Sequence, residues 1–220
     1  MNDAVVIEAK ENHRASVIWL HGLGADGNDF APVVPELGIA DELGVRYIFP
    51  HAPRRAVTVN GGMVMRSWYD IKDPDLSKGR DRKDFDASAK ILEQYIEAEI
   101  ESGIPASKII VAGFSQGGAI TLHCGLAYHR QLAGMLVLSS YLPFAEILDD
   151  EHSGINHMTP ILMAHGEYDP LIPIDFARQS ADTLKQRGYD LAWHSFPMQH
   201  GVCIEEIKLI GDWLNKQLGD

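Results

Sequence analysis

The segment IIVAGFSQGGA, residues 109–119, places a serine between glycines where an aliphatic run gives way to a helical pattern. This order predicts a strand, a sharp turn and a helix, with Ser115 at the apex of the turn. Gly113 and Gly117 permit a strained backbone and close helix packing, because they carry no Cβ atom. The start of the helix also offers backbone N–H groups beside the serine, where a negative oxygen can be stabilised. Ser115 is therefore the candidate nucleophile, and the alternative is a glycine-rich turn without chemistry.

On both sides of this segment, short aliphatic runs alternate with segments of helical period. The alternation predicts an α/β fold, with a mostly parallel central sheet and helices on both of its faces. The expected strands are Ser16–Leu20, Val45–Phe49, Ile109–Gly113, Met135–Ser139 and Pro160–Ala164, with flanking strands at Val5–Glu8 and Asp190–Phe196. The expected helices are Phe85–Glu101, Ala119–Tyr128, Ile174–Arg187 and a final helix that includes Ile207 and Leu218.

The chain of 220 residues is long enough for one full-sized domain and short for two. Neither an internal repeat nor a linker rich in Pro or Gly divides it, so we expect residues 1–220 to form a single domain. The longest stretch without a clear period is His51–Lys83. A loop of that length inside a compact domain is usually functional.

A serine hydroxyl needs a general base, and the base needs an acid that orients it. In a sheet of this kind both are expected downstream of the serine, with the acid first. The Pro160–Ala164 strand continues into HGEYDP at 165–170, where Asp169 lies in a turn and is our candidate acid. Glu167 is the alternative, since it lies nearer the strand. His200, on a short loop before the last helix, is the predicted base.

Attack on an acyl carbon creates an oxyanion that needs two hydrogen-bond donors. One is expected to be the N–H of Gln116, and the other that of Leu23 in the loop HGLGADG at 21–27. The same loop also matches the G-x-G-x-x-G pattern between Gly22 and Gly27, which offers a nucleotide-binding oxidoreductase as a distant alternative. That alternative requires an acid after the next strand, where the sequence has PHAP at 50–53. A loop that presents N–H groups accounts for the glycines equally well.

The composition excludes several classes of partner. A formal net charge of −12 disfavours nucleic acid and anionic membranes. No run approaches the roughly 18–20 apolar residues of a membrane span, so stable membrane insertion is not expected. The two cysteines, Cys124 and Cys203, suggest neither a disulfide framework nor a metal cage. No targeting segment is evident, so we expect a cytoplasmic protein without metal or cofactor.

Seven segments in the same order resemble the phospholipase/carboxylesterase family, which includes the acyl-protein thioesterases and lysophospholipases. They are LHGLGADGNDF at 20–30, FPHAP at 49–53, SWYDI at 67–71, GFSQGGA at 113–119, SSYLP at 139–143, HGEYDPLIP at 165–173 and HG at 200–201. The resemblance implies an α/β-hydrolase fold without a large cap domain. It also implies Ser115, Asp169 and His200 as a catalytic triad, with Leu23 and Gln116 as oxyanion donors.

Two departures from the family concern the acyl site. Family members often carry Phe where Tyr69 stands, and a small residue plus Trp or Tyr around Tyr141. These positions border the acyl site, so the departures leave the preferred chain length undecided. Family substrates are carboxylic esters, lysophospholipids and acyl thioesters, and a few members act on S-acylated proteins.

Apolar loop residues at the expected catalytic end are candidates for binding an acyl chain. The candidates are Met63, Met65, Trp68, Leu142, Leu171 and Met198. Methionine suits such a groove because its side chain adapts to varied shapes. Each of these residues has the alternative of packing beneath the 51–83 segment, and for Trp68 this anchoring role is the favoured interpretation.

The expected function is that of a serine carboxylesterase or thioesterase, which cleaves single-chain acyl esters or thioesters through an acyl-enzyme. A lysophospholipase is the alternative. A non-catalytic binding module is disfavoured, because all three residue types of a triad are present. The expected partner is a small acyl ester, a lysophospholipid or an acylated protein. The sequence leaves the oligomeric state open, a weak homodimer included.

Overall fold

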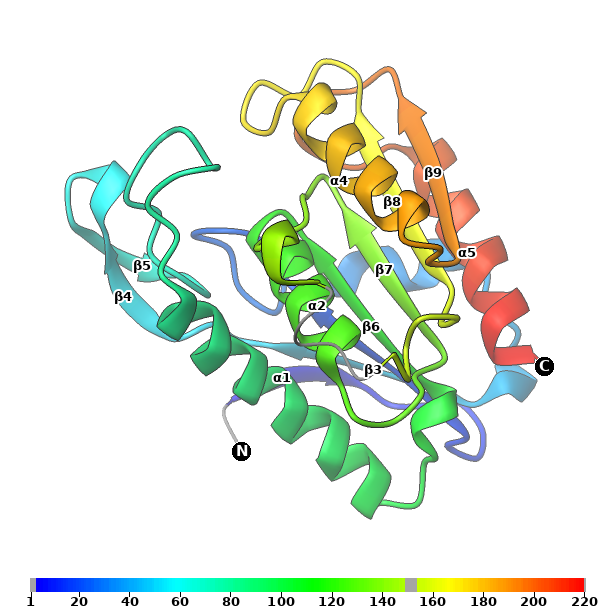
Figure 1. The fold of residues 1–220 in the computed structure, drawn as a ribbon. Helices are drawn as coiled ribbons and strands as arrows, with labels where there is room; N and C mark the ends of the chain where they lie inside the picture. Colours follow the sequence, from blue (N-terminus) through cyan, green and yellow to red (C-terminus); the bar gives the residue numbers. More distant parts are fainter. Residues whose placement is uncertain (1–2, 149–153, 220) are drawn as a thin grey trace.

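The computed structural model describes residues 3–148 and 154–219. Within these residues, seven strands form one sheet in the order β1-β3-β2-β6-β7-β8-β9 (Figure 1). Strand β1 pairs antiparallel with β3, and all other neighbours in this sheet are parallel. The strands are β1 (Ala4–Ile7), β2 (Ala15–Leu20), β3 (Val45–Pro50), β6 (Ile109–Phe114), β7 (Gly134–Leu138), β8 (Ile161–Gly166) and β9 (Leu191–Phe196).

Both faces of the sheet are covered, which explains why its strands read as continuous apolar runs. Alternate residues of β2 point to opposite faces. Ile18 and Leu20 join one core and Val17 and Trp19 the other. The first core is completed by α1 (Arg82–Glu101), α2 (Gln116–Ala127) and α4 (Ile174–Gln186), and the second by α5 (Ile204–Gly219) and the 3₁₀ segment η1 (Ala31–Leu37) (Figure 1). The predicted α/β-hydrolase fold is confirmed, and the described residues hold no large cap domain.

Helix ends differ from prediction where local capping decides them. Helix α1 begins at Arg82 rather than Phe85, because the Asp81 side chain accepts a hydrogen bond from the Lys83 N–H and caps the helix. Helix α2 begins directly after the serine turn, three residues earlier than the apolar pattern indicates. No described helix combines the length and the apolar character that a bilayer span requires.

The segment 51–83 is more regular than predicted. It contains an antiparallel hairpin of β4 (Arg54–Val57) and β5 (Met63–Arg66), joined through η3 (Thr58–Asn60). Gly61 and Gly62 follow with φ of 65° and 79°, conformations that glycine adopts without strain. The hairpin escaped the sequence pattern because the residues of its two short strands, RRAV and MVMR, do not alternate between polar and apolar types. In Figure 1 it extends from the end of the sheet at which α1 begins.

Candidate active site

The turn between β6 and α2 holds Ser115 in a strained conformation. Its φ of 54° and ψ of −118° lie where side chains other than glycine are rarely found. The Ser115 N–H donates to the Leu138 carbonyl at 2.9 Å, and the Ser115 carbonyl accepts from Ser140 Oγ at 2.7 Å. These two bonds fix the serine backbone to the end of β7 and the residues that follow it. Maintained strain of this kind is typical of functional sites.

The glycines of the motif are required by close backbone approach. A Cβ atom at Gly113 would lie 2.3 Å from the carbonyl of Gly117, and one at Gly117 would lie 2.4 Å from the carbonyl oxygen of Leu20. Both distances are well inside van der Waals contact. The turn therefore packs helix α2 against β2 and β6 so tightly that only glycine fits at these two positions.

His200 and Asp169 form a direct pair. His200 Nδ1 lies 2.6 Å from Asp169 Oδ2, while Asp169 Oδ1 accepts hydrogen bonds from the N–H groups of Leu171 and Ile172, both at 2.9 Å. Burial of Asp169 would raise its pKa, but the hydrogen bonds from His200 and from the two backbone amides outweigh burial and leave the pKa below its ordinary value. The carboxylate is therefore ionised, so His200 donates from Nδ1 and keeps Nε2 as a proton acceptor.

Glu167, the alternative acid, and the neighbouring His165 make different contacts. Glu167 accepts a hydrogen bond from Ser195 Oγ at 3.2 Å and is exposed. His165 is buried, and its Nε2 lies 2.8 Å from the Ile172 carbonyl oxygen and 3.4 Å from Asp169 Oδ2. The carboxyl group that the structure brings to His200 is therefore that of Asp169. His165 makes the packed, hydrogen-bonded contacts expected of a structural residue.

Ser115 and His200 line the same cavity, of about 590 Å³, together with Leu23 and Gln116. Both side chains are half-buried, so each is open to the cavity and shielded from bulk water. The structure thus brings four of the five predicted catalytic and oxyanion residues to one wall. The fifth, Asp169, lies behind His200 with its side chain fully buried.

The Gln116 side chain has a role that the sequence did not predict. Its Oε1 accepts from the Trp68 N–H at 3.0 Å, and its Nε2 donates to the Tyr69 carbonyl at 2.8 Å. Both ends of the side-chain amide are thus hydrogen-bonded to the 67–69 segment and hold it in place. Only the backbone N–H of Gln116, at the open start of a helix, is left for the cavity.

The loop that carries Leu23 is tied to the 51–83 segment. Gly24 N–H donates to the Arg66 carbonyl at 2.9 Å, and Gly27 N–H donates to His51 Nδ1 at 2.9 Å. A Cβ atom at Gly27 would lie 2.3 Å from the Phe49 carbonyl oxygen. Packing against β3 therefore explains this glycine of the G-x-G-x-x-G pattern, and no nucleotide is needed to account for it.

His21 begins the same loop and is held in its neutral form. Burial lowers its pKa to about 4. Its Nδ1 lies 2.7 Å from the Gly22 carbonyl, and its Nε2 accepts from the Ala52 N–H at 3.0 Å. The Trp68 indole N–H donates to the His21 carbonyl at 2.8 Å. A neutral imidazole that is hydrogen-bonded at both ring nitrogens thus sets the path of the chain into the loop.

The predicted acyl-binding residues are placed unevenly. Leu171 lines the cavity, with 64% of its surface exposed. The other five are not part of its lining: Met63, Met65, Trp68, Leu142 and Met198. Trp68 is fully buried and acts as an anchor, whereas Met63 is 64% exposed on the hairpin. Contact of these five with a substrate stays a prediction.

The cavity wall is built from other apolar side chains, several of which sequence reasoning missed. The apolar lining residues that the sequence did not single out are Val59, Ile71, Pro74, Leu76, Phe114 and Pro170, whereas Tyr69 and Tyr141 were expected at the border of the acyl site. The Tyr69 and Tyr141 hydroxyls are hydrogen-bonded to each other at 3.1 Å and form a polar pair within this apolar wall. Ile71 and Leu76 had one sequence signal, since each is an isolated apolar residue in the charged segment DIKDPDL at 70–76. Such residues in a loop must pack against something apolar.

Comparison with known proteins decides the family. The family model described as phospholipase/carboxylesterase matches residues 1–218. The chain belongs to this family. Acyl-protein thioesterase 1 of Gibberella zeae is 39% identical over 223 residues, which cover 97% of this chain and 95% of that protein. The family membership and these relatives make the chain a serine hydrolase that acts on ester or thioester bonds.

Solved structures agree with this assignment. Arabidopsis thaliana SOBER1 superposes with a TM-score of 0.86 at 31% identity, covering 93% of this chain and 99% of that one. Acyl-protein thioesterase 2 of Zea mays superposes with a TM-score of 0.85 at 28% identity, with 100% of both chains covered. The likeness therefore extends over nearly the whole chain.

Proposed function

We propose that the chain is a carboxylesterase or thioesterase that cleaves single-chain acyl esters or thioesters, with Ser115, His200 and Asp169 as its triad. The observation that carries the proposal is the hydrogen-bonded Asp169–His200 pair, whose imidazole shares one cavity with the strained serine. The apolar wall of that cavity suits an alkyl chain. As part of the same proposal, residues 1–220 work as one domain in the cytoplasm.

The geometry supports a two-step reaction. His200 Nε2 accepts the proton of Ser115 Oγ as the oxygen attacks the acyl carbon, and the imidazolium that forms is stabilised by the Asp169 carboxylate. The N–H groups of Leu23 and Gln116 bind the oxyanion. The protonated His200 then gives its proton to the departing alcohol or thiol, which leaves an ester on Ser115. Water, deprotonated by the same histidine, cleaves that ester and releases a carboxylic acid.

The named thioesterase relatives extend the proposed substrates to S-acylated proteins, since their names state acyl-protein thioesterase activity. The exposure of Leu171 at the cavity supports an opening that a substrate attached to a larger body can use. A lysophospholipid is the alternative within the same family. The discriminating measurement compares octanoyl groups carried by a thiol, by p-nitrophenol and by glycerophosphocholine.

The test of the proposal is labelling with a fluorophosphonate probe, which reacts only with an activated serine. We expect one adduct, on the peptide that contains Ser115, and none in Ser115→Ala. The matched control is Ser77→Ala, which removes an exposed serine outside the cavity. Ester hydrolysis by Ser115→Ala should fall by several orders of magnitude. Turnover within a few-fold of wild type, or an adduct on another serine, would overturn the assignment.

A further inference from the structure

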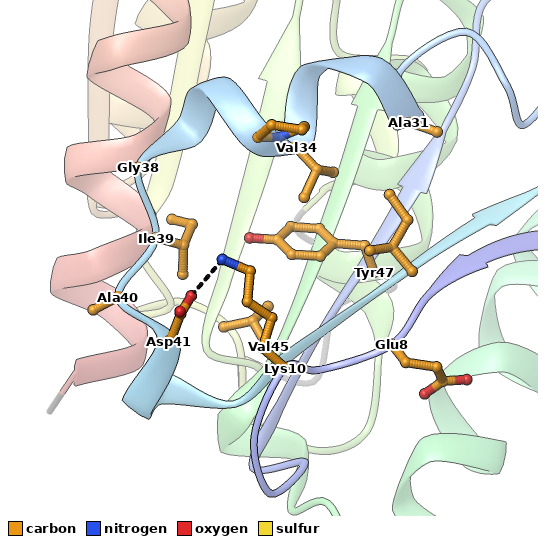
Figure 2. A pocket seen from close by; sticks show the side chains of 12 residues that line it. Glu8, Lys10, Ala31, Val34, Gly38, Ile39, Ala40, Asp41, Val45 and Tyr47 are labelled. Carbon is orange, nitrogen blue, oxygen red and sulfur yellow. Dashed lines mark hydrogen bonds and ion pairs between the residues drawn. The ribbon is translucent and has the colours of Figure 1, made fainter.

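A second cavity, of about 390 Å³, lies on the sheet face that η1 and α5 cover (Figure 2). It is enclosed by η1, by the 38–41 segment that follows it, and by residues of β1 and β3 and the chain after β1. None of its lining residues lines the catalytic cavity. Its volume falls within the range of roughly 300–1,000 Å³ that is usual for small-molecule sites.

A buried phenol points into this cavity. Tyr47 is only 3% exposed, and its hydroxyl has no hydrogen-bond partner among the described residues. Figure 2 shows the hydroxyl directed toward the Lys10 ammonium, below Val34 and beside Ile39. Burial raises the pKa of Tyr47 well above its ordinary value, so the phenol stays protonated and can donate.

The phenol is costly to the fold in the absence of a ligand. Burying a hydroxyl destabilises the folded protein unless a new partner replaces the water to which the hydroxyl was hydrogen-bonded. The Tyr47 ring stacks on Phe49 with centroids 6.4 Å apart, and a phenylalanine would make the same stacking contact. Packing alone therefore explains the ring and leaves the oxygen unexplained.

The mouth of the cavity selects the charge of a ligand. Lys10 Nζ pairs with Asp41 Oδ1 at 2.8 Å, and Glu8, also on the rim, pairs with Arg46 at 3.3 Å. Both cations at the mouth are thus already paired with carboxylates, which leaves an anionic ligand without a free cation among them. A neutral hydroxyl is complementary, since its oxygen can accept from Tyr47 or Lys10 while its proton is donated to Asp41.

We propose that this Tyr47 cavity binds a neutral alcohol, with its hydrocarbon body among Ile7, Val34 and Val45 and its hydroxyl between Tyr47 and the Lys10–Asp41 pair. The apolar part of the lining desolvates the body, and the polar end fixes its orientation. The site is separate from Ser115, so the inference does not depend on the proposed hydrolase triad.

The experiment titrates octan-1-ol into isotope-labelled protein and follows backbone amides by two-dimensional NMR. We expect saturable shifts of amides in η1 and β3, which can be fitted separately from shifts of Leu23 or Ile71 at the catalytic cavity. Octanoate, with the same chain and a charged head, should bind at the Tyr47 cavity at least several-fold more weakly. Absence of saturable shifts in η1 and β3, or equal affinity for octanoate, would overturn the proposal.

Two variants test the chemistry of the site. Tyr47→Phe should weaken octan-1-ol binding by roughly 3- to 10-fold, the worth of one hydrogen bond, and leave the Tm unchanged or higher. Val34→Trp should fill the cavity and abolish the shifts. The matched control is Tyr168→Phe, at a tyrosine that is 64% exposed and outside both cavities. Unchanged affinity in Tyr47→Phe, or a lowered Tm, would show that the hydroxyl serves the fold and not a ligand.

Discussion

Replacing Asp169 with asparagine should disable His200, the proposed general base, while leaving every atom of the proposed triad close to its place. The two backbone donors at Leu171 and Ile172 hold the side-chain oxygen Oδ1 at 2.9 Å each. In Asp169→Asn they retain the amide oxygen there, so the NH₂ group takes the position of Oδ2, 2.6 Å from His200 Nδ1. That NH₂ can only donate. His200 must then accept at Nδ1 and carry its proton on Nε2, where it cannot receive the proton of Ser115.

The size of the loss follows from the alternative orientation of the amide. Turning its oxygen toward His200 would place NH₂ against two backbone N–H donors and leave both unsatisfied. Each buried donor without a partner costs about 1–3 kcal/mol. The unproductive orientation is therefore favoured by about 2–6 kcal/mol, or roughly 30- to 10⁴-fold at 1.36 kcal/mol for each factor of ten. The same substitution in another triad enzyme lowers kcat by about 10⁴-fold.

The assay is kcat for a short p-nitrophenyl ester at neutral pH, with thermal unfolding as a check that the variant is folded. Glu167→Gln is the matched control, because its carboxylate contacts Ser195 at the exposed end of β9 and does not reach His200. We expect the kcat of the control to stay within about threefold of wild type, because a surface substitution usually changes stability by no more than about 0.5 kcal/mol and this one does not touch His200. A folded Asp169→Asn protein with near wild-type kcat, or a crippled Glu167→Gln, would refute the reasoning.

Three further predictions concern pH and chain length. Burial raises the pKa of Glu206 to about 8, against 4.5 in the unfolded chain, so the free energy of unfolding falls as pH rises from 4.5 to 8. Glu206→Gln should raise the free energy of unfolding by up to about 5 kcal/mol at alkaline pH and by little near pH 4.5, as measured by urea unfolding. His21 changes stability in the opposite direction. Its pKa is about 4 in the folded protein against 6.5 in the unfolded chain, so the free energy of unfolding falls by up to about 3 kcal/mol as pH drops from 6.5 to 4. In the same unfolding series, the free energy of unfolding of His21→Asn should depend less steeply on pH. For acyl esters, kcat/KM should rise from acetyl to mid-length acyl chains, by up to about 0.8 kcal/mol per buried methylene. Ile71→Ala should flatten that rise more than Met65→Ala, because of these two residues only Ile71 lines the cavity. Equal slopes in both variants would show that the acyl chain binds elsewhere.

The five strands that lie between β1 and β9 in the sheet could be predicted because they are buried on both faces. In β2, all six residues are buried and all but Ser16 are apolar, so the run stands out from its polar flanks. All seven expected strands are present, with ends shifted by at most two residues. The hairpin β4–β5 could not be found in this way, because most of its residues are not buried and its sequences RRAV and MVMR do not alternate between polar and apolar residues. Segment η1 was missed for a related reason, since Pro35 lies inside it and interrupts any helical pattern.

The polar part of the site was more predictable than its wall because chemistry restricts it more. The base that serves a serine in this fold is a histidine on a loop near a carboxyl group, and few positions in the chain satisfy that demand. An acyl groove requires only apolar side chains, which many loops provide. Ile71 and Leu76 line the cavity while Met63 and Met65 do not, although all four are apolar residues of the same 51–83 segment. Only the path of the chain distinguishes them.

That path gives the 51–83 segment a different role from the one its composition suggested. At the end of the hairpin, the Arg66 carbonyl accepts a hydrogen bond from the Gly24 N–H. Just after it, the Trp68 N–H and the Tyr69 carbonyl are hydrogen-bonded to the side-chain amide of Gln116. One stretch of chain therefore holds both loops that carry the proposed oxyanion donors. A change in the hairpin should then lower kcat equally for every acyl length, because the oxyanion is common to all substrates. A change at Ile71 or Leu76 should alter the dependence on chain length, because these side chains form the wall. The segment thus holds the loops of the proposed oxyanion donors with its backbone and lines the cavity with a separate set of side chains.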